Sequence, residues 1–270
     1  MLARLSSGKA MKLQRFRGEK MCRIKFMNTE IDNLTMAEIL SAVDDLIRQN
    51  KDAYVVTPNV DHIVKLETNE KLKAAYSEAD LILTDGKPLV WASRLYRNPI
   101  KEKVSGSDLF PELCKFAAER HYKMFFLGAK EGVAAKAAEI LKAKYDGLEI
   151  VGCYSPAIGF EKNSEEIENI ARMVQRANPH ILILALGCPK QEIFAYEFRK
   201  KFHVPVSFCL GATLDFAAGN VKRAPRWMAD AGLEWVYRIY QEPARMFKRY
   251  VLEDWRFVKL FVKYFGKKAS

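Results

Sequence analysis

Short apolar runs alternate with amphipathic stretches between residues 50 and 220, and this alternation limits the folds open to the chain. The apolar runs predict strands at Ala53–Thr57, Leu81–Thr84, Lys123–Leu127, Glu149–Cys153, His180–Leu186 and Val204–Leu210. Stretches between them have the apolar spacing of helices, at Gly132–Tyr145, Ser164–Ala177 and Gln191–Phe202. Strands that are apolar almost throughout and alternate with helices are typical of a parallel sheet covered on both faces. The pattern therefore predicts an α/β fold, a Rossmann-like parallel sheet sandwich.

Polar residues follow four of these strands, where a parallel sheet binds its ligands. The four loops are TPNVDH (57–62), TDGKP (84–88), GCPKQE (187–192) and GATLD (211–215). Because parallel strands end at one edge of the sheet, these loops are expected to surround one cleft. Each also has a simpler interpretation: Asp85 can belong to a turn, Thr57 and Asn59 can cap a helix, and Pro189 can begin one.

Common phosphate and metal motifs are missing from the sequence. No GxxxxGK[ST] occurs and no GxGxxG follows a strand, which disfavours a P-loop NTPase and a standard dinucleotide site. LGAKEG (127–132) does follow a strand and open a helix, so its N–H groups can meet a phosphate. The four histidines lack metal-ligand spacing, and no metal or other cofactor is predicted. Five cysteines without a CxxC pair favour a cytosolic location.

The net charge of +11 belongs to the two ends of the chain. Residues 1–30 contribute +6 and residues 221–270 contribute +7. This distribution favours a local anionic partner and argues against a nucleic-acid-binding protein. Three segments are predicted: a disordered basic leader (1–24), a catalytic domain (25–220) and a helical C-terminal appendage (221–270).

The C-terminal segment contains three of the four tryptophans. Two helices are predicted there, at about 226–240 and 243–265, because Pro243 interrupts helical hydrogen bonding. In the second helix, apolar residues recur at helical spacing and basic residues lie mainly elsewhere. Such a helix can pack on the core, but its basic and aromatic character favours one that lies on an anionic membrane surface. No apolar run is long enough to span a bilayer.

Seven motifs in order resemble the WecG/TagA/CpsF family of glycosyltransferases. They are TPNVDH, TDGKP, GSDLF (106–110), LGAKEG, GCPKQE, GATLDFAAGNVKRAP and LEWVYRIYQEPARMFKRY. The resemblance covers about residues 25–260 and implies a Rossmann-like domain whose C-terminal appendage touches the membrane and completes the active site. The activity it implies is inverting transfer of a sugar from a UDP-sugar to a polyprenyl-diphosphate-linked sugar, in cell-surface polysaccharide or teichoic acid synthesis. This would take place at the cytoplasmic face of the membrane.

N-acetylmannosamine is the sugar that the resemblance favours, with N-acetylglucosamine on the acceptor. UDP-N-acetylmannosamine uronic acid, UDP-glucose and UDP-galactose are alternative donors, and a homo-oligomer is possible. An alternative of another class is a basic membrane or nucleic-acid adaptor without catalysis, which the polar strand-end loops disfavour. An NAD-dependent oxidoreductase is disfavoured because GxGxxG is missing.

Residue roles follow from the same resemblance. Asp85 is implied as the general base, with Thr57 and Asn59 beside a substrate sugar. Arg238 and Arg245 are implied to stabilise the leaving UDP. Further substrate-binding residues are expected at Gly128, Gly187, Lys190, Gln191, Asp108, Thr213, Asp215, Arg223, Lys248 and Arg249. Relatives often carry paired arginines where Lys248 and Arg249 stand, and a lysine cannot offer the bidentate fork of an arginine.

Overall fold

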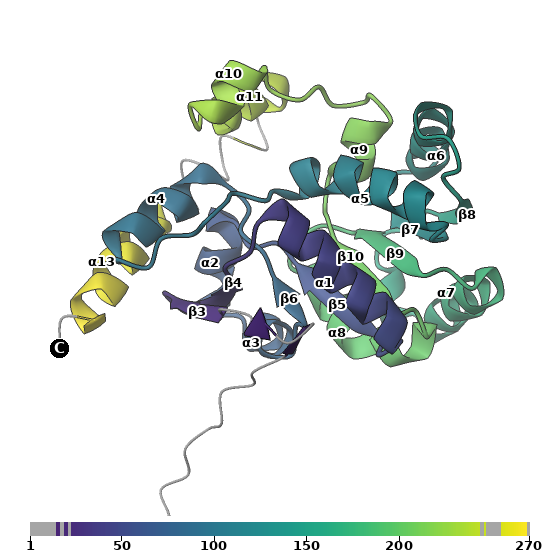
Figure 1. Ribbon diagram of the computed structural model, residues 1–270, viewed down its shortest axis with the longest axis horizontal. Coiled ribbons are helices and arrows are strands. Elements are labelled where there is room, and N and C mark those ends of the chain that lie inside the picture. Colours follow the sequence, from purple (N-terminus) through teal and green to yellow (C-terminus); the bar gives the residue numbers. More distant parts are fainter. Residues whose placement is uncertain (1–14, 17–18, 21–22, 244–245, 247–254, 269–270) are drawn as a thin grey trace, which may run out of the picture.

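A six-stranded parallel sheet forms the centre of the protein, as the computed structural model shows (Figure 1). The structure describes residues 15–16, 19–20, 23–243, 246 and 255–268. The strand order is β6-β5-β10-β9-β7-β8. Their bounds are Ala53–Val56 (β5), Leu81–Ile82 (β6), Met124–Gly128 (β7), Ile150–Tyr154 (β8), Ile181–Ala185 (β9) and Val206–Cys209 (β10). Each strand lies within or next to a predicted run, and every pairing in the sheet is parallel, so the predicted fold class is confirmed.

Helices cover both faces of the sheet and enclose two apolar cores (Figure 1). One face carries α1 (Met36–Gln49), α5 (Gly106–Arg120) and α6 (Val133–Lys144). The other carries α2 (Val60–Leu66), α3 (Glu70–Ser77), α4 (Lys87–Leu95), α7 (Ser164–Ala177) and α8 (Lys190–Phe202). Side chains alternate along each strand, so Val55 belongs to one core while Tyr54 and Val56 belong to the other. Both faces are therefore buried, which is why the strand sequences are apolar throughout.

Helix α7 shows how local sequence sets these elements. Asn163 caps its N-terminus by accepting from the backbone N–H groups of Glu165 and Glu166. Asn178 ends the helix in a left-handed conformation, with φ of 46°. The residues that it buries recur at helical spacing: Ile167, Ile170, Ala171 and Val174. Complete burial of an isoleucine or valine side chain contributes about 1.5–3 kcal/mol.

Two short hairpins precede the first helix, although residues 1–24 were expected to be disordered. The described part of the leader contains β1 (Arg15–Phe16) and β2 (Glu19–Lys20), which pair antiparallel. The hairpin that follows consists of β3 (Arg23–Phe26) and β4 (Thr29–Asp32). Arg23 donates two hydrogen bonds of 2.8 Å to the buried Asp32 carboxylate, which also accepts from the backbone N–H of Ile82 at 2.8 Å. Burial of apolar residues and the Arg23–Asp32 ion pair therefore fix the β3–β4 hairpin beside β6.

The C-terminal helices differ from the prediction. The helix expected at 226–240 is two helices, α10 (Arg226–Asp230) and α11 (Glu234–Gln241), which lie above α4 and α9 (Thr213–Ala217) in Figure 1. Gly232 separates them with φ of 73°, and a Cβ atom there would lie 2.6 Å from the Trp91 ring. The turn at Gly232 divides the predicted helix into two, and this turn was not predicted from the sequence. Of the second predicted helix, the structure describes α13 (Arg256–Lys268), while most of 244–254 lies outside the described residues.

Helix α13 packs on α2 with one face and exposes apolar side chains on the other. Leu260 is buried, and the Tyr96 hydroxyl donates to the backbone carbonyl of Phe261 at 2.7 Å. On the opposite face, Val258 and Val262 are 59% and 66% exposed. The helix therefore packs on the core with one face and leaves an apolar strip uncovered on the other, and its contact with a membrane stays a prediction. Among the described residues, no helix combines the length and apolarity required to cross a bilayer.

Candidate active site

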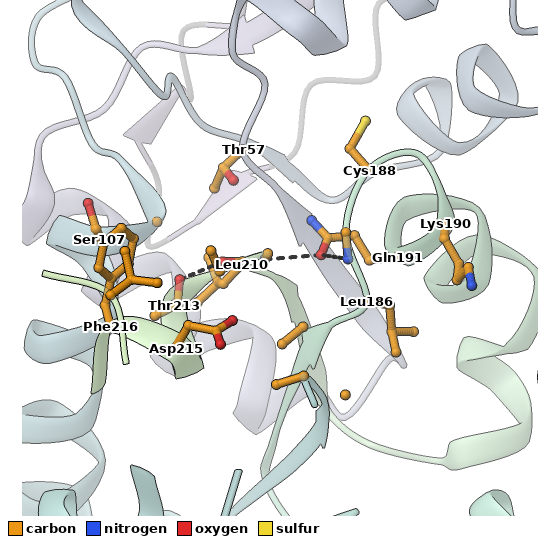
Figure 2. Close-up of a pocket in the computed structure, with 18 of the residues that line it drawn as sticks. Thr57, Ser107, Leu186, Cys188, Lys190, Gln191, Leu210, Thr213, Asp215 and Phe216 are labelled. Carbon is orange, nitrogen blue, oxygen red and sulfur yellow. Dashed lines mark hydrogen bonds between the residues drawn. The ribbon is translucent and has the colours of Figure 1, made fainter. Parts of the chain in front are cut away.

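A cleft of about 1010 Å³ opens along the carboxyl ends of the strands (Figure 2). Its wall includes ten of the predicted site residues, which are Thr57, Asn59, Asp85, Gly128, Gly187, Lys190, Gln191, Thr213, Asp215 and Arg238. The four polar loops therefore converge as a parallel sheet requires. The loop after β7 joins them, because Gly128, Ala129 and Lys130 also line the cleft. Arg238 comes from α11 and lies over the Phe216 ring, 5.0 Å from its centroid.

Asp85 is the carboxylate best placed for proton transfer. Its backbone N–H donates to the Pro58 carbonyl at 2.9 Å, which ties the loop after β6 to the loop after β5. Within the described residues its carboxylate has no hydrogen bond or ion pair, and it stays partly exposed to the cleft. Burial raises the pKa of Asp85 to about 6 and the nearby Glu234 adds to the rise, against the opposing charge of Arg238. A general base works best with a pKa near the working pH.

A second, smaller cavity of about 120 Å³ is also lined by Asp85. It shares Asn59, Asp85, Glu234 and Arg238 with the large cleft. Its own wall adds Lys87, Lys103 and Trp235, among other residues. Asp85 therefore belongs to the walls of two cavities of different size.

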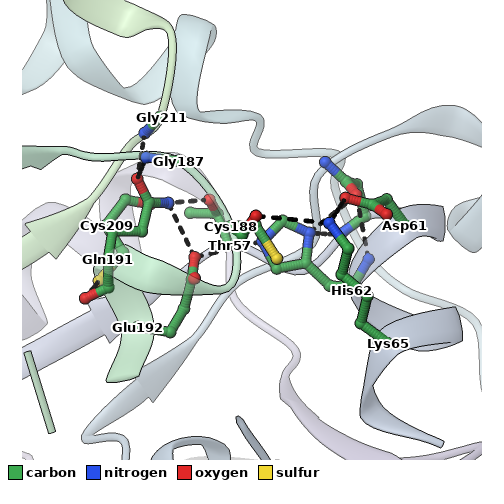
Figure 3. A network of polar contacts seen from close by, with 11 residues as sticks. Thr57, Asp61, His62, Lys65, Gly187, Cys188, Gln191, Glu192, Cys209 and Gly211 are labelled. Carbon is green, nitrogen blue, oxygen red and sulfur yellow. Dashed lines mark hydrogen bonds and ion pairs between the residues drawn. The ribbon is translucent and has the colours of Figure 1, made fainter. Parts of the chain in front are cut away.

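Gln191 supports the shape of the cleft from within. Its Oε1 accepts backbone N–H groups from Gly187 at 3.1 Å and Gly211 at 3.0 Å (Figure 3). Its Nε2 donates to Glu192 Oε1 at 2.7 Å, and the residue is only 3% exposed. The side chain thus joins the loops after β9 and β10. Thr57 makes a similar link, because its hydroxyl donates to the Cys209 carbonyl at 3.3 Å.

Asp108 and Arg223 pair with each other and do not line the cleft. The Asp108 carboxylate also binds Lys103 at 2.8 Å and accepts the Ser105 hydroxyl at 2.6 Å. Burial would raise the pKa of Asp108, but Lys103, Ser105 and Arg223 outweigh it and lower that pKa. The pair therefore supports Lys103 at the wall of the small cavity, and direct substrate contact by either member stays a prediction. Arg245, Lys248 and Arg249 lie outside the described residues.

Several polar residues of the site were not predicted from the sequence. Lys103 and Glu234 do not follow a strand, so the strand-end rule could not find them. His62 and Glu192 were within the quoted motifs, but their contact links positions 130 residues apart. The spacing of three residues between Asn59 and His62 could have indicated that they interact, because they form a capping box at the start of α2.

Three possible metal ligands, Asp61, His62 and Cys188, have ligand atoms within 4.8 Å of one another. Asp61 already pairs with Lys65 at 2.8 Å. Both ring nitrogens of His62 face oxygen atoms of other side chains. Protein contacts thus engage two of the three ligands, and we assign no metal to this group.

Comparison with known proteins places the chain in a family. The sequence model of the Glycosyl transferase WecG/TagA/CpsF family matches residues 24–270, so the chain belongs to this family and is a glycosyltransferase. This excludes the adaptor without catalysis.

Relatives with one shared name are similar to most of the chain. A protein of Bacillus spizizenii (strain ATCC 23059 / NRRL B-14472 / W23), named N-acetylglucosaminyldiphosphoundecaprenol N-acetyl-beta-D-mannosaminyltransferase, is 36% identical over 77% of this chain and 80% of its own length. A protein of the same name from Bacillus subtilis (strain 168) is 36% identical over 63% of this chain and 64% of its own length. Another, from Staphylococcus aureus (strain MRSA252), is 25% identical over 80% and 84%, respectively.

Proposed function

We propose that this enzyme transfers N-acetylmannosamine from a UDP-sugar to N-acetylglucosamine on a polyprenyl diphosphate. The names of the relatives support the transferred sugar and the acceptor. The observation that carries the mechanism is Asp85, a carboxylate that lines both cavities and whose burial raises its pKa to about 6. The larger cavity has room for a nucleotide-sugar, and the smaller one suits the end of the acceptor.

In this reaction the acceptor hydroxyl lies beside Asp85 and attacks the anomeric carbon of the donor. The bond from that carbon to the diphosphate oxygen breaks, and UDP leaves with the electron pair. Asp85 takes the hydroxyl proton, and attack from the opposite face inverts the anomeric configuration. Asp85 must therefore be ionised before transfer, and a pKa of about 6 leaves most molecules ionised at pH 7.

Positive charge is needed where the UDP diphosphate leaves. Arg238 is well placed for this role because it lines both cavities and its guanidinium packs on Phe216. Lys130 at the mouth of the large cleft adds a second cation. Arg245, together with Lys248 and Arg249, is proposed to extend this positive surface in the segment beyond α11.

A membrane location at the cytoplasmic face completes the proposal. The lipid-linked acceptor named for the relatives requires access to a bilayer. Trp255 precedes α13 and forms an exposed strip with Val258 and Val262, and the ammonium of Lys259 lies over the Trp255 ring. Apolar side chains beside lysines suit the interface of an anionic membrane.

Release of UDP from a panel of donors tests the proposal. The donors are UDP-N-acetylmannosamine, its uronic acid, UDP-glucose and UDP-galactose, each with and without a short-chain polyprenyl-diphosphate-N-acetylglucosamine. UDP release that needs the acceptor and is fastest with UDP-N-acetylmannosamine would support the full proposal. Preference for another donor would refute the transferred sugar, and rapid transfer by Asp85→Asn would refute the assignment of the base.

A further inference from the structure

One face of α4 leads from the small cavity to the surface of the protein. Lys87, Trp91 and Leu95 are four residues apart, so they lie on the same face of this helix. Lys87 lines the small cavity, whereas Trp91 and Leu95 are 48% and 62% exposed. Because an α-helix rises about 1.5 Å per residue, the face extends about 12 Å away from the cavity. It joins a cation at the cavity to large apolar side chains at the surface.

The turn between α10 and α11 packs on this face of α4. A Cβ atom at Gly232 would lie 2.6 Å from the Trp91 ring and 3.3 Å from Lys87 Cβ, and Gly232 itself lines the small cavity. Trp235 of α11 also lines the cavity, although 43% of this residue is exposed. The cavity wall is therefore continuous with the apolar face of α4.

Lys87 gives the cavity wall a positive charge that no protein group compensates. Among the described residues, its ammonium has no hydrogen bond or ion pair. The other charged residues of the wall are two cations and two acids: Lys103, Arg238, Asp85 and Glu234. Lys103 already pairs with Asp108 at 2.8 Å. Lys87 is thus suited to an anionic group of a ligand, and lysine is a common partner of phosphate.

The other end of α4 contacts α13, so α4 reaches from the cavity to the helix proposed to touch the membrane (Figure 1). Tyr96 is the C-cap of α4. The centroid of its ring lies 5.2 Å from that of Phe261 and 5.6 Å from that of Phe265. A lipid chain that leaves the bilayer beside α13 can therefore follow α4 to the cavity.

We propose that this face of α4 binds the polyprenyl diphosphate of the acceptor, with Lys87 on the diphosphate and Trp91 and Leu95 on the first isoprene units. The proposal rests on the proposed function, in which the acceptor hydroxyl lies beside Asp85. The acceptor sugar separates that hydroxyl from the diphosphate, so the cation must lie about one sugar ring from Asp85. Lys87 meets this requirement, because Cα atoms two residues apart are at most about 7 Å from each other.

The surface of a bilayer is the other apolar partner that could cover Trp91 and Leu95. A bilayer surface cannot enter a cavity of about 120 Å³, whereas a prenyl diphosphate carries its anion and its apolar chain in one molecule. The order of the residues along α4, with the lysine at the cavity and the apolar side chains beyond it, matches the order of these groups. The chain of the acceptor is therefore the favoured occupant.

The dependence of transfer on the length of the lipid tests the apolar part of the site. The full protein is given N-acetylglucosamine diphosphates that carry either a farnesyl or a methyl group. In Trp91→Ala and Leu95→Ala, the preference for the farnesyl acceptor in kcat/KM should fall about tenfold, the low end for lost apolar contacts. Ile140→Ala, which truncates an exposed isoleucine of α6 on the other face of the sheet, is the matched control and should keep this preference. An unchanged preference in both α4 variants would overturn the proposal, also where Leu95→Ala weakens binding to liposomes.

Substitution of Lys87 tests the contact with the diphosphate. Lys87→Gln should raise KM for both acceptors about tenfold, because both carry the diphosphate and lose a hydrogen bond to a charged group. Lys87→Arg, which keeps the positive charge, should restore most of the loss. A wild-type KM in Lys87→Gln would refute this contact.

Calorimetry with farnesyl diphosphate and inorganic diphosphate examines the site without any transfer. The wild type should bind farnesyl diphosphate about tenfold more tightly, Leu95→Ala should reduce this difference, and Lys87→Gln should weaken the binding of both. Equal affinities for the two ligands in the wild type, or affinities that Lys87→Gln leaves unchanged, would overturn the proposal. If no donor supports transfer, the proposed function fails, while these affinities still decide whether α4 binds a prenyl diphosphate.

Discussion

Asp85→Asn should abolish most activity and stabilise the protein at the same time. Removal of a general base typically slows a reaction by about 10²–10⁴-fold. The opposite effect on stability follows from the pKa of the carboxyl, which the fold raises from 3.8 to about 6. A difference of about two pH units corresponds to roughly 3 kcal/mol between the charged and neutral forms.

The pH at which the stabilisation is seen follows from the direction of the shift. Because the folded protein binds this proton more tightly than the unfolded chain, the favourable contribution of Asp85 is fully present only below pH 3.8. It disappears as the pH rises through about 6, so the ionised carboxylate destabilises the fold at pH 8. Asparagine removes that penalty. Each kcal/mol raises Tm by about 2–4 °C for a protein near this size, so an increase of several degrees is expected at pH 8.

Thermal unfolding at pH 8 and pH 4.5, combined with UDP release at pH 8, measures both effects. The gain in Tm for Asp85→Asn should be large at pH 8 and small at pH 4.5. Asp108→Asn is the matched control, because the fold lowers the pKa of Asp108 and its stabilisation is lost as the pH falls. That variant should be less stable than the wild type at pH 8. Equal Tm for Asp85→Asn and the wild type at pH 8 would refute the argument from burial, and wild-type turnover would refute the base.

Three further substitutions test other parts of the structure. Arg238→Lys should lower kcat about as much as Arg238→Ala in UDP-release assays, because lysine cannot reproduce the planar guanidinium fork; full activity of the lysine variant would contradict this. Gly128→Ala should lower Tm more than Gly159→Ala, since both glycines have a positive φ but only at Gly128 would a Cβ atom lie 2.5 Å from the Ala185 carbonyl oxygen. Val262→Asp should weaken sedimentation with anionic liposomes without lowering Tm, because the side chain is exposed; unchanged binding would count against the membrane role of α13.

The sheet and its cleft could be predicted because their signals are local. Six apolar runs marked the six strands, and the parallel arrangement then required the loops at 57–62, 84–88, 187–192 and 211–215 to meet. No distance has to be known for this prediction, since the loops at the carboxyl ends of parallel strands all lie at the same edge of the sheet. Nine of the ten predicted site residues that line the cleft do so for that reason, while Arg238 comes from α11.

Features that depend on contacts between distant segments could not be predicted in this way. Gln191 was expected near the nucleotide-sugar, yet its carbonyl oxygen binds two backbone N–H groups of neighbouring loops. Asp108 was expected to bind substrate, but Lys103 and Arg223 engage it. In both cases the positions of the neighbouring donors show a structural role that the residue type alone did not reveal, and contact with a substrate stays a prediction. The break at Gly232 has the same origin, because the Trp91 ring lies where a side chain would go.

In the proposed mechanism, helix α11 of the C-terminal segment acts on Asp85. Glu234 and Arg238 are four residues apart on α11, so they share one face of the helix, and both line the two cavities beside Asp85. Their charges act on the base in opposite directions, since Glu234 raises the pKa of Asp85 and Arg238 lowers it. Movement of α11 away from the sheet would expose Asp85 to water and remove both charges together. Because burial is the largest cause of the raised pKa, Asp85 would then return toward an ordinary, weakly basic carboxylate. In the proposed mechanism, the position of α11 at the cleft therefore sets the strength of Asp85 as the base and places Arg238 as the cation for the leaving group.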